Sequence, residues 1–354
     1  MDESRFSFLE RMITSPSPSG FEQPVQQVIR EEIKQFTDEV RTDVHGNVIA
    51  ALNPSGTPRV MLTAHCDELG FLIRYIDEQG FLYFAPIGGF DPSTLPGNRV
   101  LVQTPDGPIP GVIGRPPVHT LSSDDRSKAP KLTDLWIDIG AADQEEAKKL
   151  VPLGSVATRA ATLEHLRNNI VVSRALDDKS SVFAISETMR RLHAQREALK
   201  ASVFFVSAVQ EEVGSRGART AAYSVDPLIA VAVDVTFTSD HPAVSKKELG
   251  EVKLNGGPVL SLGGNINPRV YQFLIKAAEE AGISWQIDPQ PSNTWTDTDV
   301  IQVARGGIAT ALVSIPCRYL HTGSEMASLK DMDEVAELLT RFVLSLDKET
   351  NVIP

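Results

Sequence analysis

Hydrophobic and polar positions divide the chain into two α/β segments separated by a strand-rich block. Short apolar runs bounded by turn residues are typical of buried strands, and apolar residues at helical spacing are typical of amphipathic helices. The pattern predicts strands at residues 48–52, 59–64, 201–209, 229–233 and 308–315. It predicts helices near the N-terminus and at residues 22–36, 178–192, 268–281 and 332–346.

The block between residues 72 and 164 has a different pattern. Short strands alternate there with Gly and Pro turns, as in GNRVLVQTPDGPIPGVIG, which is typical of a small β-barrel or sandwich. Strand–helix alternation on both sides of this block indicates an α/β domain with an inserted β domain. We therefore expect residues 1–71 and 165–354 to form one α/β domain and residues 72–164 to form the insertion.

Composition and charge narrow the functional classes. The 354 residues are enough for about two domains, and the net charge of −12 argues against binding to nucleic acid or to an anionic membrane surface. No apolar stretch approaches the ~18 residues of a membrane span, and the N-terminal segment lacks the apolar core of a secretory signal. With Cys66 and Cys317 as its only cysteines, the chain has no disulfide framework, so we expect a cytoplasmic protein.

Polar residues follow four apolar strands at the point where each strand ends. In open α/β sheets this carboxyl edge is where ligands bind. A further pair of acids, Asp177 and Asp178, stands at the entrance to a predicted helix. The residues that follow the strands are His65, Asp67, Glu211, Glu212, Asp234 and His321.

This set of side chains favours a metal site. Several carboxylates in one crevice would leave a large uncompensated negative charge, which two divalent cations would neutralise. Ligation by imidazole together with carboxylate suits zinc, cobalt or manganese. Paired cations lie about 3.5–4 Å apart and need a bridging ligand with two oxygens, as a carboxylate has.

Each residue also has an ordinary structural interpretation. His65 alone could be a buried structural histidine, Asp177–Asp178 a helix N-cap, and Glu211–Glu212 a solvated pair. Asp234 could simply end a strand, and His321 could cap a turn. Their shared position at strand ends favours the metal site over these separate interpretations.

The cysteines are weaker candidates as metal ligands. Because successive strand residues point to opposite faces, Cys66 is expected to face away from His65 and Asp67. We interpret Cys66 and Cys317 as small buried apolar residues.

Five ordered motifs resemble those of the tetrahedral (TET) aminopeptidases, a family that includes glutamyl and deblocking aminopeptidases. They are TAHCDELGF, ALDDKSS, QEEVGSRGA, the Asp of VAVDVTFTSDHP, and CRYLHTGSE. The resemblance spans nearly the whole chain. It implies an α/β peptidase-like fold, with a central mixed sheet flanked by helices and an inserted small β-barrel that serves as a dimerisation domain.

The resemblance also implies a dinuclear metallo-aminopeptidase that removes N-terminal residues from peptides. His65 and Asp234 would complete one metal site, Glu212 and His321 would complete the other, and Asp177 would bridge the two ions. Zinc is the expected metal, with cobalt or manganese as alternatives. The peptide bond after Asp177 is expected to be cis.

Two further roles follow from the same resemblance. Glu211 would act as general base towards a metal-activated water and then as general acid, and Asp67 would orient His65. Relatives assemble from dimers into twelve-subunit tetrahedra, so self-association is expected. Trp295-Thr296-Asp297-Thr298 stands where many relatives have Gly-Thr-Asp-Ala, which leaves the side-chain preference open.

Two alternatives belong to other functional classes. Members of this family have often been labelled endoglucanases, but Glu211 and Glu212 are adjacent in sequence and could not easily flank a sugar bond. A catalytically inactive assembly protein would be expected to lack a ligand or the base, and this chain has them all. Chelation separates the first alternative from a metallopeptidase, and assays with added metal test the second.

Overall fold

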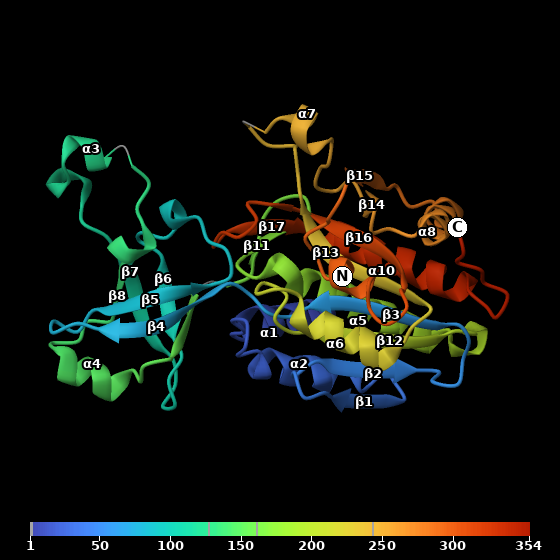
Figure 1. Ribbon diagram of the computed structural model, residues 1–354, viewed down its shortest axis with the longest axis horizontal. Coiled ribbons are helices and arrows are strands. Elements are labelled where there is room, and N and C mark those ends of the chain that lie inside the picture. The colour runs from blue at the N-terminus through green and yellow to red at the C-terminus, as the bar shows by residue number, and fades with distance from the viewer. Residues whose placement is uncertain (1–2, 127, 161, 243) are drawn as a thin grey trace.

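The computed structural model describes residues 3–126, 128–160, 162–242 and 244–354. Figure 1 shows an α/β body built on a large central sheet and a separate small barrel beside it. This arrangement confirms the predicted fold class of a mixed central sheet flanked by helices with an inserted barrel.

Eleven strands of the described residues form the central sheet. They are β1 (Glu39–Thr42), β2 (Val48–Leu52), β3 (Arg59–His65), β10 (Glu164–His165), β11 (Ile170–Ser173), β12 (Ser202–Ala208), β13 (Ile229–Phe237), β14 (Val259–Gly263), β15 (Gln286–Gln290), β16 (Ala309–Arg318) and β17 (Glu325–Ser328). The order is β1-β2-β12-β3-β13-β16-β17-β11-β10, with β14 paired to both β15 and β16. Strands β12, β3, β13 and β16 run parallel, and the strands that flank them are antiparallel.

Helices cover both faces of this sheet. The described helices of the α/β body are α1 (Glu3–Thr14), α2 (Gln23–Ile33), α5 (Leu176–Ala194), α6 (Arg216–Val225), α7 (Lys246–Leu249), α8 (Pro268–Ala281), α9 (Thr298–Ile301) and α10 (Leu329–Ser345). Buried residues of α1, α2, α5, α8 and α10 form one apolar core with the sheet, and those of α6 and α9 form a second core on the opposite face. The parallel strands between the two layers are therefore buried on both sides, which explains their continuous apolar runs.

The inserted barrel closes on itself. Its strands are β4 (Gly70–Ile76), β5 (Leu82–Ile87), β6 (Arg99–Val102), β7 (Ile109–Gly114), β8 (Trp136–Asp138) and β9 (Val156–Arg159), with the short helices α3 (Ser123–Arg126) and α4 (Gln144–Leu150). The barrel order is β4-β5-β8-β7-β6-β9. An apolar core of its own, including Phe71, Ile113 and Ile137, fills the interior.

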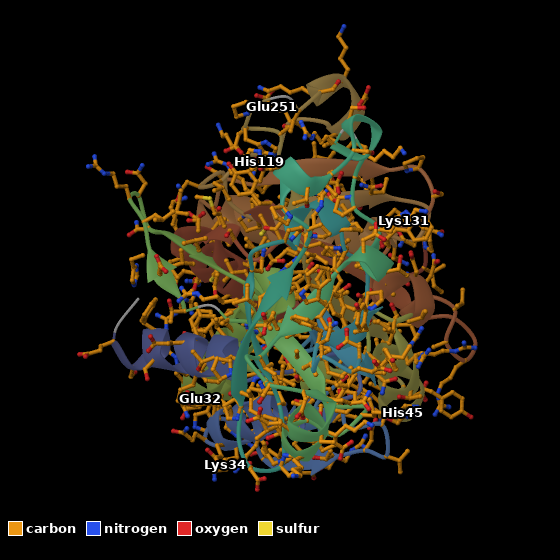
Figure 2. All side chains as sticks on the ribbon, turned by 90° about the vertical axis from the view of Figure 1, so that its left-hand side faces the viewer. Glu32, Lys34, His45, His119, Lys131 and Glu251 are labelled. Atoms are coloured by element: carbon orange, nitrogen blue, oxygen red, sulfur yellow. The ribbon has the colours of Figure 1, made fainter. Side chains whose placement is uncertain are left out.

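The surface is polar and carries charges of both signs. Figure 2 shows acidic and basic side chains spread over one side of the molecule, among them Glu32, Lys34, Lys131 and Glu251. Of the helices in the described ranges, none is both long enough and apolar enough to cross a bilayer.

Candidate metal centre

The site residues lie where parallel strands of the central sheet end. His65 is the last residue of β3 and pairs in register with Ala208 at the end of β12. Asp234 lies in β13, opposite Ser314 of β16. Because β12, β3, β13 and β16 are parallel, the residues that follow or end them converge at one edge of the sheet.

A single carboxylate, Asp177, lies between the two candidate histidines. Its Oδ1 lies 3.2 Å from Nε2 of His65, and its Oδ2 lies 3.3 Å from Nε2 of His321. The Nε2 of His321 is also 3.6 Å from Oε1 of Glu212, and the Nε2 of His65 is 3.9 Å from Oδ1 of Asp234. The structure thus brings together all five residues that the sequence singled out as metal ligands.

These separations suit coordination of cations. Ligand atoms around a tetrahedral ion at ~2.1 Å are about 3.4 Å apart. Two groups of possible donors have all their ligand atoms within 4.8 Å of one another. They are His65 with Asp178 and Asp234, and Asp177 with Glu212 and His321.

The backbone around Asp177 departs from regular helix. Ala175 has φ 57°, and Asp177 and Asp178 at the start of α5 have non-helical dihedral angles. The peptide bond between Asp177 and Asp178 is cis, as expected from the family resemblance. Asp177 and Asp178 are both buried at the start of α5, and each belongs to one of the two donor groups.

Asp67 contacts both His65 and the backbone of Glu211 and Glu212. Its Oδ1 lies 3.4 Å from Nδ1 of His65, as expected for a residue that orients this histidine. The same carboxylate accepts hydrogen bonds from the backbone N–H groups of Glu211 (3.0 Å) and Glu212 (3.2 Å) and from the hydroxyl of Ser19 (2.6 Å). The backbone carbonyl of Asp67 lies 3.2 Å from Nδ1 of His65, so Asp67 contacts both the imidazole and the loop that carries the two glutamates.

The chain turns between β12 and the two glutamates. Gln210 adopts φ 59°, so Glu211 and Glu212 do not continue the strand. Oε2 of Glu211 lies 3.9 Å from Nε2 of His65, and Oε1 accepts a hydrogen bond of 3.2 Å from Ser215. Glu211 thus lies beside the candidate ligands and belongs to neither donor group.

Burial and the crowding of like charges shift the pKa values of the site residues. Desolvation, with nearby Asp177, raises the pKa of Glu212 and of Asp234 well above their usual values. Burial also raises the pKa of Glu211. Burial opposes the charged form of His65, but hydrogen bonds to Asp177 and Asp67 outweigh it and raise the pKa of this imidazole. Such a cluster of acids is the setting in which divalent cations relieve electrostatic repulsion.

The sequence interpretation gave no role to three buried carboxylates next to the site. Asp178 groups with His65 and Asp234, Glu325 accepts the backbone N–H of Asp177, and Asp297 is buried close to Glu211. Asp178 could have been suggested by its adjacency to Asp177. Glu325 ends the motif CRYLHTGSE and Asp297 lies in the Trp295–Thr298 segment, but neither pattern assigned them a role, and only the fold shows that they lie next to the site. Near Asp297, Trp295 is 83% exposed, in the segment that departs from the family pattern.

The cysteines lie outside the ligand set. Cys66 and Cys317 are both buried and unpaired, and both belong to the apolar core of the sheet. This confirms their interpretation as small core residues. Burial raises the pKa of the Cys66 thiol well above its ordinary range.

Comparison with known proteins decides the family. The M42 glutamyl aminopeptidase profile matches residues 46–338. The chain belongs to the M42 glutamyl aminopeptidase family. Like the other members, it is a metal-dependent aminopeptidase, an enzyme that hydrolyses peptide bonds.

Similar sequences and structures agree with this M42 assignment. A lysyl aminopeptidase from Pyrococcus furiosus is 35% identical over 94% of this chain and 95% of its own length. A TET aminopeptidase from the archaeon Thaumarchaeota archaeon SCGC AB-539-E09 is 31% identical, has a TM-score of 0.94, and is matched over 98% of both chains. The Pyrococcus horikoshii TET1 peptidase is 32% identical, with a TM-score of 0.85, over 97% of this chain and 100% of its own. These likenesses favour the peptidase over the endoglucanase and inactive alternatives.

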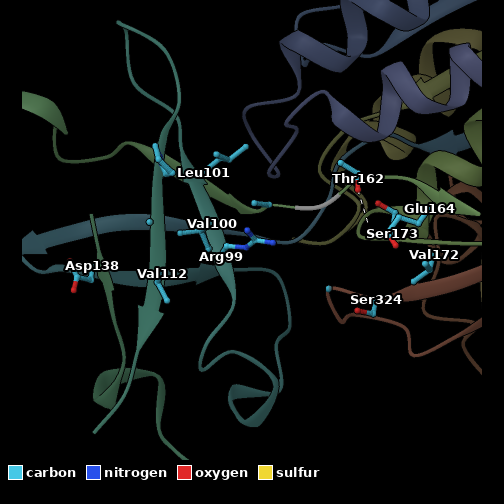
Figure 3. Close-up of a pocket in the computed structure, with 14 residues that line it drawn as sticks. Arg99, Val100, Leu101, Val112, Asp138, Thr162, Glu164, Val172, Ser173 and Ser324 are labelled. Carbon is cyan, nitrogen blue, oxygen red and sulfur yellow. Dashed lines mark hydrogen bonds between the residues drawn. The ribbon is translucent and has the colours of Figure 1, made fainter. Parts of the chain in front are cut away.

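A cavity with none of the candidate ligands in its lining lies apart from the donor groups. It has a volume of about 750 Å³ and lies between barrel strands β6 and β7 and the strands at the edge of the central sheet, as Figure 3 shows. Arg99 and Val112 line one side, and Glu164, Val172 and Ser324 line the other. None of the candidate ligands lines this cavity. We therefore assign the chemistry to the cluster at the sheet edge.

Proposed function

We propose that this M42 aminopeptidase holds two divalent cations in the two donor groups at the sheet edge. His65 and Asp234 would complete one site, Glu212 and His321 would complete the other, and Asp177 would be shared. The observation that carries the proposal is the position of Asp177, whose two oxygens face the Nε2 atoms of different histidines at 3.2 and 3.3 Å. Asp178 would add an oxygen donor to the first site, since its ligand atom lies within 4.8 Å of those of His65 and Asp234.

The donor chemistry favours zinc, with cobalt and manganese as alternatives. Neutral imidazole together with carboxylate oxygens is a common ligand set for all three ions. Soft ligands are not needed, since both cysteines lie in the apolar core. When bound, such ions polarise a peptide carbonyl and bring the pKa of water towards neutrality.

Glu211 is proposed as the proton-transfer residue. It would accept a proton at a carboxylate oxygen as water attacks the peptide carbonyl and then donate that proton to the leaving amine. Burial raises the pKa of Glu211, which brings it closer to the range useful for both roles. The Ser215 hydroxyl, which donates to Oε1, would leave Oε2 to face the reacting water. Asp67 would hold both His65 and the Glu211–Glu212 backbone in place.

Removal and replacement of metal test this proposal. We expect protein treated with EDTA to lose cleavage of aminoacyl-p-nitroanilides and to regain it on addition of Zn²⁺, Co²⁺ or Mn²⁺. Metal analysis of the active protein should give two ions per chain. Retention of full peptidase activity without bound metal would refute the proposal.

The same preparation separates the alternatives. A glycoside hydrolase that works with two carboxylates needs no metal and would be unaffected by EDTA. An inactive assembly protein would bind metal without cleaving any substrate in a broad aminoacyl panel. We expect peptide cleavage that depends on metal and no glucan hydrolysis.

Self-association is proposed from relatives. The Pyrococcus horikoshii TET1 peptidase assembles into a tetrahedron or a large octahedral shell. We propose that residues 1–71 and 165–354 form the catalytic domain of this chain and that residues 72–164 mediate dimers, from which a tetrahedral dodecamer is built. Its substrates would be peptides, and its compartment would be the cytoplasm.

A further inference from the structure

One buried carboxylate contacts the backbones of two proposed metal ligands. Glu325 is the first residue of β17 and is 3% exposed. Its Oε2 accepts a hydrogen bond of 3.1 Å from the backbone N–H of Asp177, and its Oε1 accepts one of 3.0 Å from the backbone N–H of His321. Glu325 thus links the start of α5 to the loop that follows β16.

The backbone of His321 needs such support. Its φ of 61° lies in the left-handed region, which residues with a Cβ atom rarely adopt without help from their surroundings. The N–H of His321 is held by Glu325, and its carbonyl oxygen accepts a hydrogen bond of 3.4 Å from Nη1 of Arg159. Both polar groups of the His321 backbone are therefore engaged by buried polar side chains.

Arg159, which donates to the His321 carbonyl, belongs to the barrel. It is the last residue of β9 and is 6% exposed, with its guanidinium 4.9 Å from the centre of the Phe90 ring. Its Nη2 lies 3.5 Å from Oγ1 of Thr94. Burial lowers the pKa of Arg159 to about 10, while the charge of Glu325 acts in the opposite direction.

The loop that carries His321 also packs closely on Arg159. A methyl group at Gly323 would lie 2.9 Å from Cδ of Arg159 and 3.2 Å from Oδ1 of Asn98. On the barrel side, a Cβ atom added at Gly89 would lie 3.9 Å from Nδ1 of His321. In Figure 1 the barrel adjoins the α/β body on the side where β17 and β11 lie.

We propose that Glu325 and Arg159 form a clamp that sets the separation of Asp177 and His321, and so the affinity of the site that these residues form with Glu212. Both are positioning residues, because they act through the backbone of Asp177 and His321. The proposal rests on the proposed two-cation function. It adds that the inserted barrel stabilises one of the two cation sites through Arg159.

Titration of metal-free protein with Co²⁺, followed by visible absorption, tests the clamp. Glu325→Gln preserves size but replaces one acceptor oxygen by an NH₂ group, which cannot accept from a backbone N–H. Loss of a residue that orients metal ligands typically weakens metal binding about 10–100-fold. We expect a loss of this size at the site formed by Asp177, Glu212 and His321, and a smaller loss at the other site, which shares only Asp177 with it.

Asp331→Asn is the matched control. Asp331 is also a buried carboxylate that accepts two backbone N–H groups, from Asn255 at 2.7 Å and Gly257 at 2.9 Å, and it belongs to neither donor group. Its substitution should lower the melting temperature and leave both Co²⁺ affinities unchanged. Equal loss of Co²⁺ affinity in the two variants would show that Glu325→Gln acts by general destabilisation of the fold. That result would overturn the clamp.

Arg159→Met tests the barrel side and covers the case in which Glu325→Gln does not fold. Methionine keeps an unbranched apolar side chain over Phe90 but removes the donor to the His321 carbonyl. We expect weaker Co²⁺ binding at the site that contains His321, with a changed absorption spectrum for that site. Wild-type affinity at both sites in Arg159→Met would overturn the clamp, whereas failure of the wild-type protein to bind two ions would instead overturn the proposed function.

Discussion

At the scale of single residues, the surroundings of each carboxyl group determine its behaviour. Glu68 and Glu211 are both largely buried, yet the pKa of Glu68 is lowered because Arg174 and Lys179 outweigh its burial. Glu211 instead faces His65 at 3.9 Å, beyond hydrogen-bond distance, and burial raises its pKa. The first environment suits a permanently charged structural group, and the second suits a residue that exchanges protons.

Glu211→Gln should separate metal binding from proton transfer. The variant keeps the size of the side chain and leaves the proposed ligands intact, but it cannot take a proton from water. We expect two bound cations and a kcat lowered by about 10²–10⁴-fold, the usual contribution of general acid–base catalysis. Metal analysis and initial rates on an aminoacyl-p-nitroanilide provide the two measurements, and normal turnover would show that the base is another group.

Glu22 should make stability depend on pH. Burial raises the pKa of this side chain from 4.5 to about 7, so the folded protein binds a proton that the unfolded chain has already lost at pH 6. The resulting stabilisation is complete below pH 4.5 and is lost as pH rises through about 7. Between pH 6 and 8 the loss should be on the order of 1 kcal/mol.

The matched variant for this effect is Glu22→Gln, which cannot ionise. Denaturant unfolding of metal-free protein at pH 6 and pH 8 should show a smaller fall in stability for the variant than for the wild type. Identical falls for the two proteins would mean that Glu22 ionises normally in the folded state.

At the scale of elements, close packing of helix α6 on strand β12 supports the loop that carries Glu211 and Glu212. Gly217, the second residue of α6, lies against this strand end. A Cβ atom at this position would lie 2.3 Å from Oδ1 of Asn47 and 2.4 Å from the carbonyl oxygen of Val209. Asn47 itself donates to the carbonyl of Gly217 and accepts from the N–H of Val209, so the three segments are joined at one point.

Gly217→Ala should therefore destabilise the protein despite the higher helix propensity of alanine. Propensity favours alanine by about 1 kcal/mol, whereas overpacking against backbone atoms costs about 1–3 kcal/mol and also disturbs the Asn47 hydrogen bonds. Thermal unfolding should show a lower melting temperature. Gly306→Ala is the control, because a Cβ at Gly306 meets no atom within 4 Å, and it should melt like the wild type.

At the scale of the whole molecule, the α/β body and the barrel each have an apolar core. They also meet at the metal centre, where Gly88 of the barrel would place a Cβ 3.4 Å from Cβ of Glu212. The barrel thus forms part of the wall of the site. An assembly that forms through the barrel would therefore contact the part of the molecule that lines the candidate metal site.

Light scattering coupled to size exclusion should test the proposed assembly. We expect a mass many times the 38.5 kDa of one chain, as for a closed shell, rather than a monomer. Deletion of the barrel is a poor test because the barrel adjoins Glu212. A monodisperse 38.5 kDa species at all concentrations would contradict the proposed self-association.

The prediction of elements from sequence succeeded for the parallel strands of the central sheet and for the longer helices. The strand at 48–52 and the helix at 268–281 have the predicted bounds, and the parallel strands differ by a few residues. Of the central-sheet strands, β1, β10, β11, β14, β15 and β17 were not predicted. The residues of β10 are exposed, and β15 contains Pro289 and pairs only with β14, so these edge strands lack a continuous apolar run.

The sequence alone determined the fold class and the residue types of the candidate site, because continuous apolar runs identify parallel strands and polar residues at their ends identify the ligand-binding edge. Only the tertiary structure decided the distances between those side chains, the grouping of Asp178 with His65 and the contacts of Glu325 and Arg159. The physical reason is separation along the chain. The backbone contacts of Glu325 and Arg159 join segments up to 162 residues apart, and no local pattern encodes a contact that depends on the packing of a barrel against a sheet.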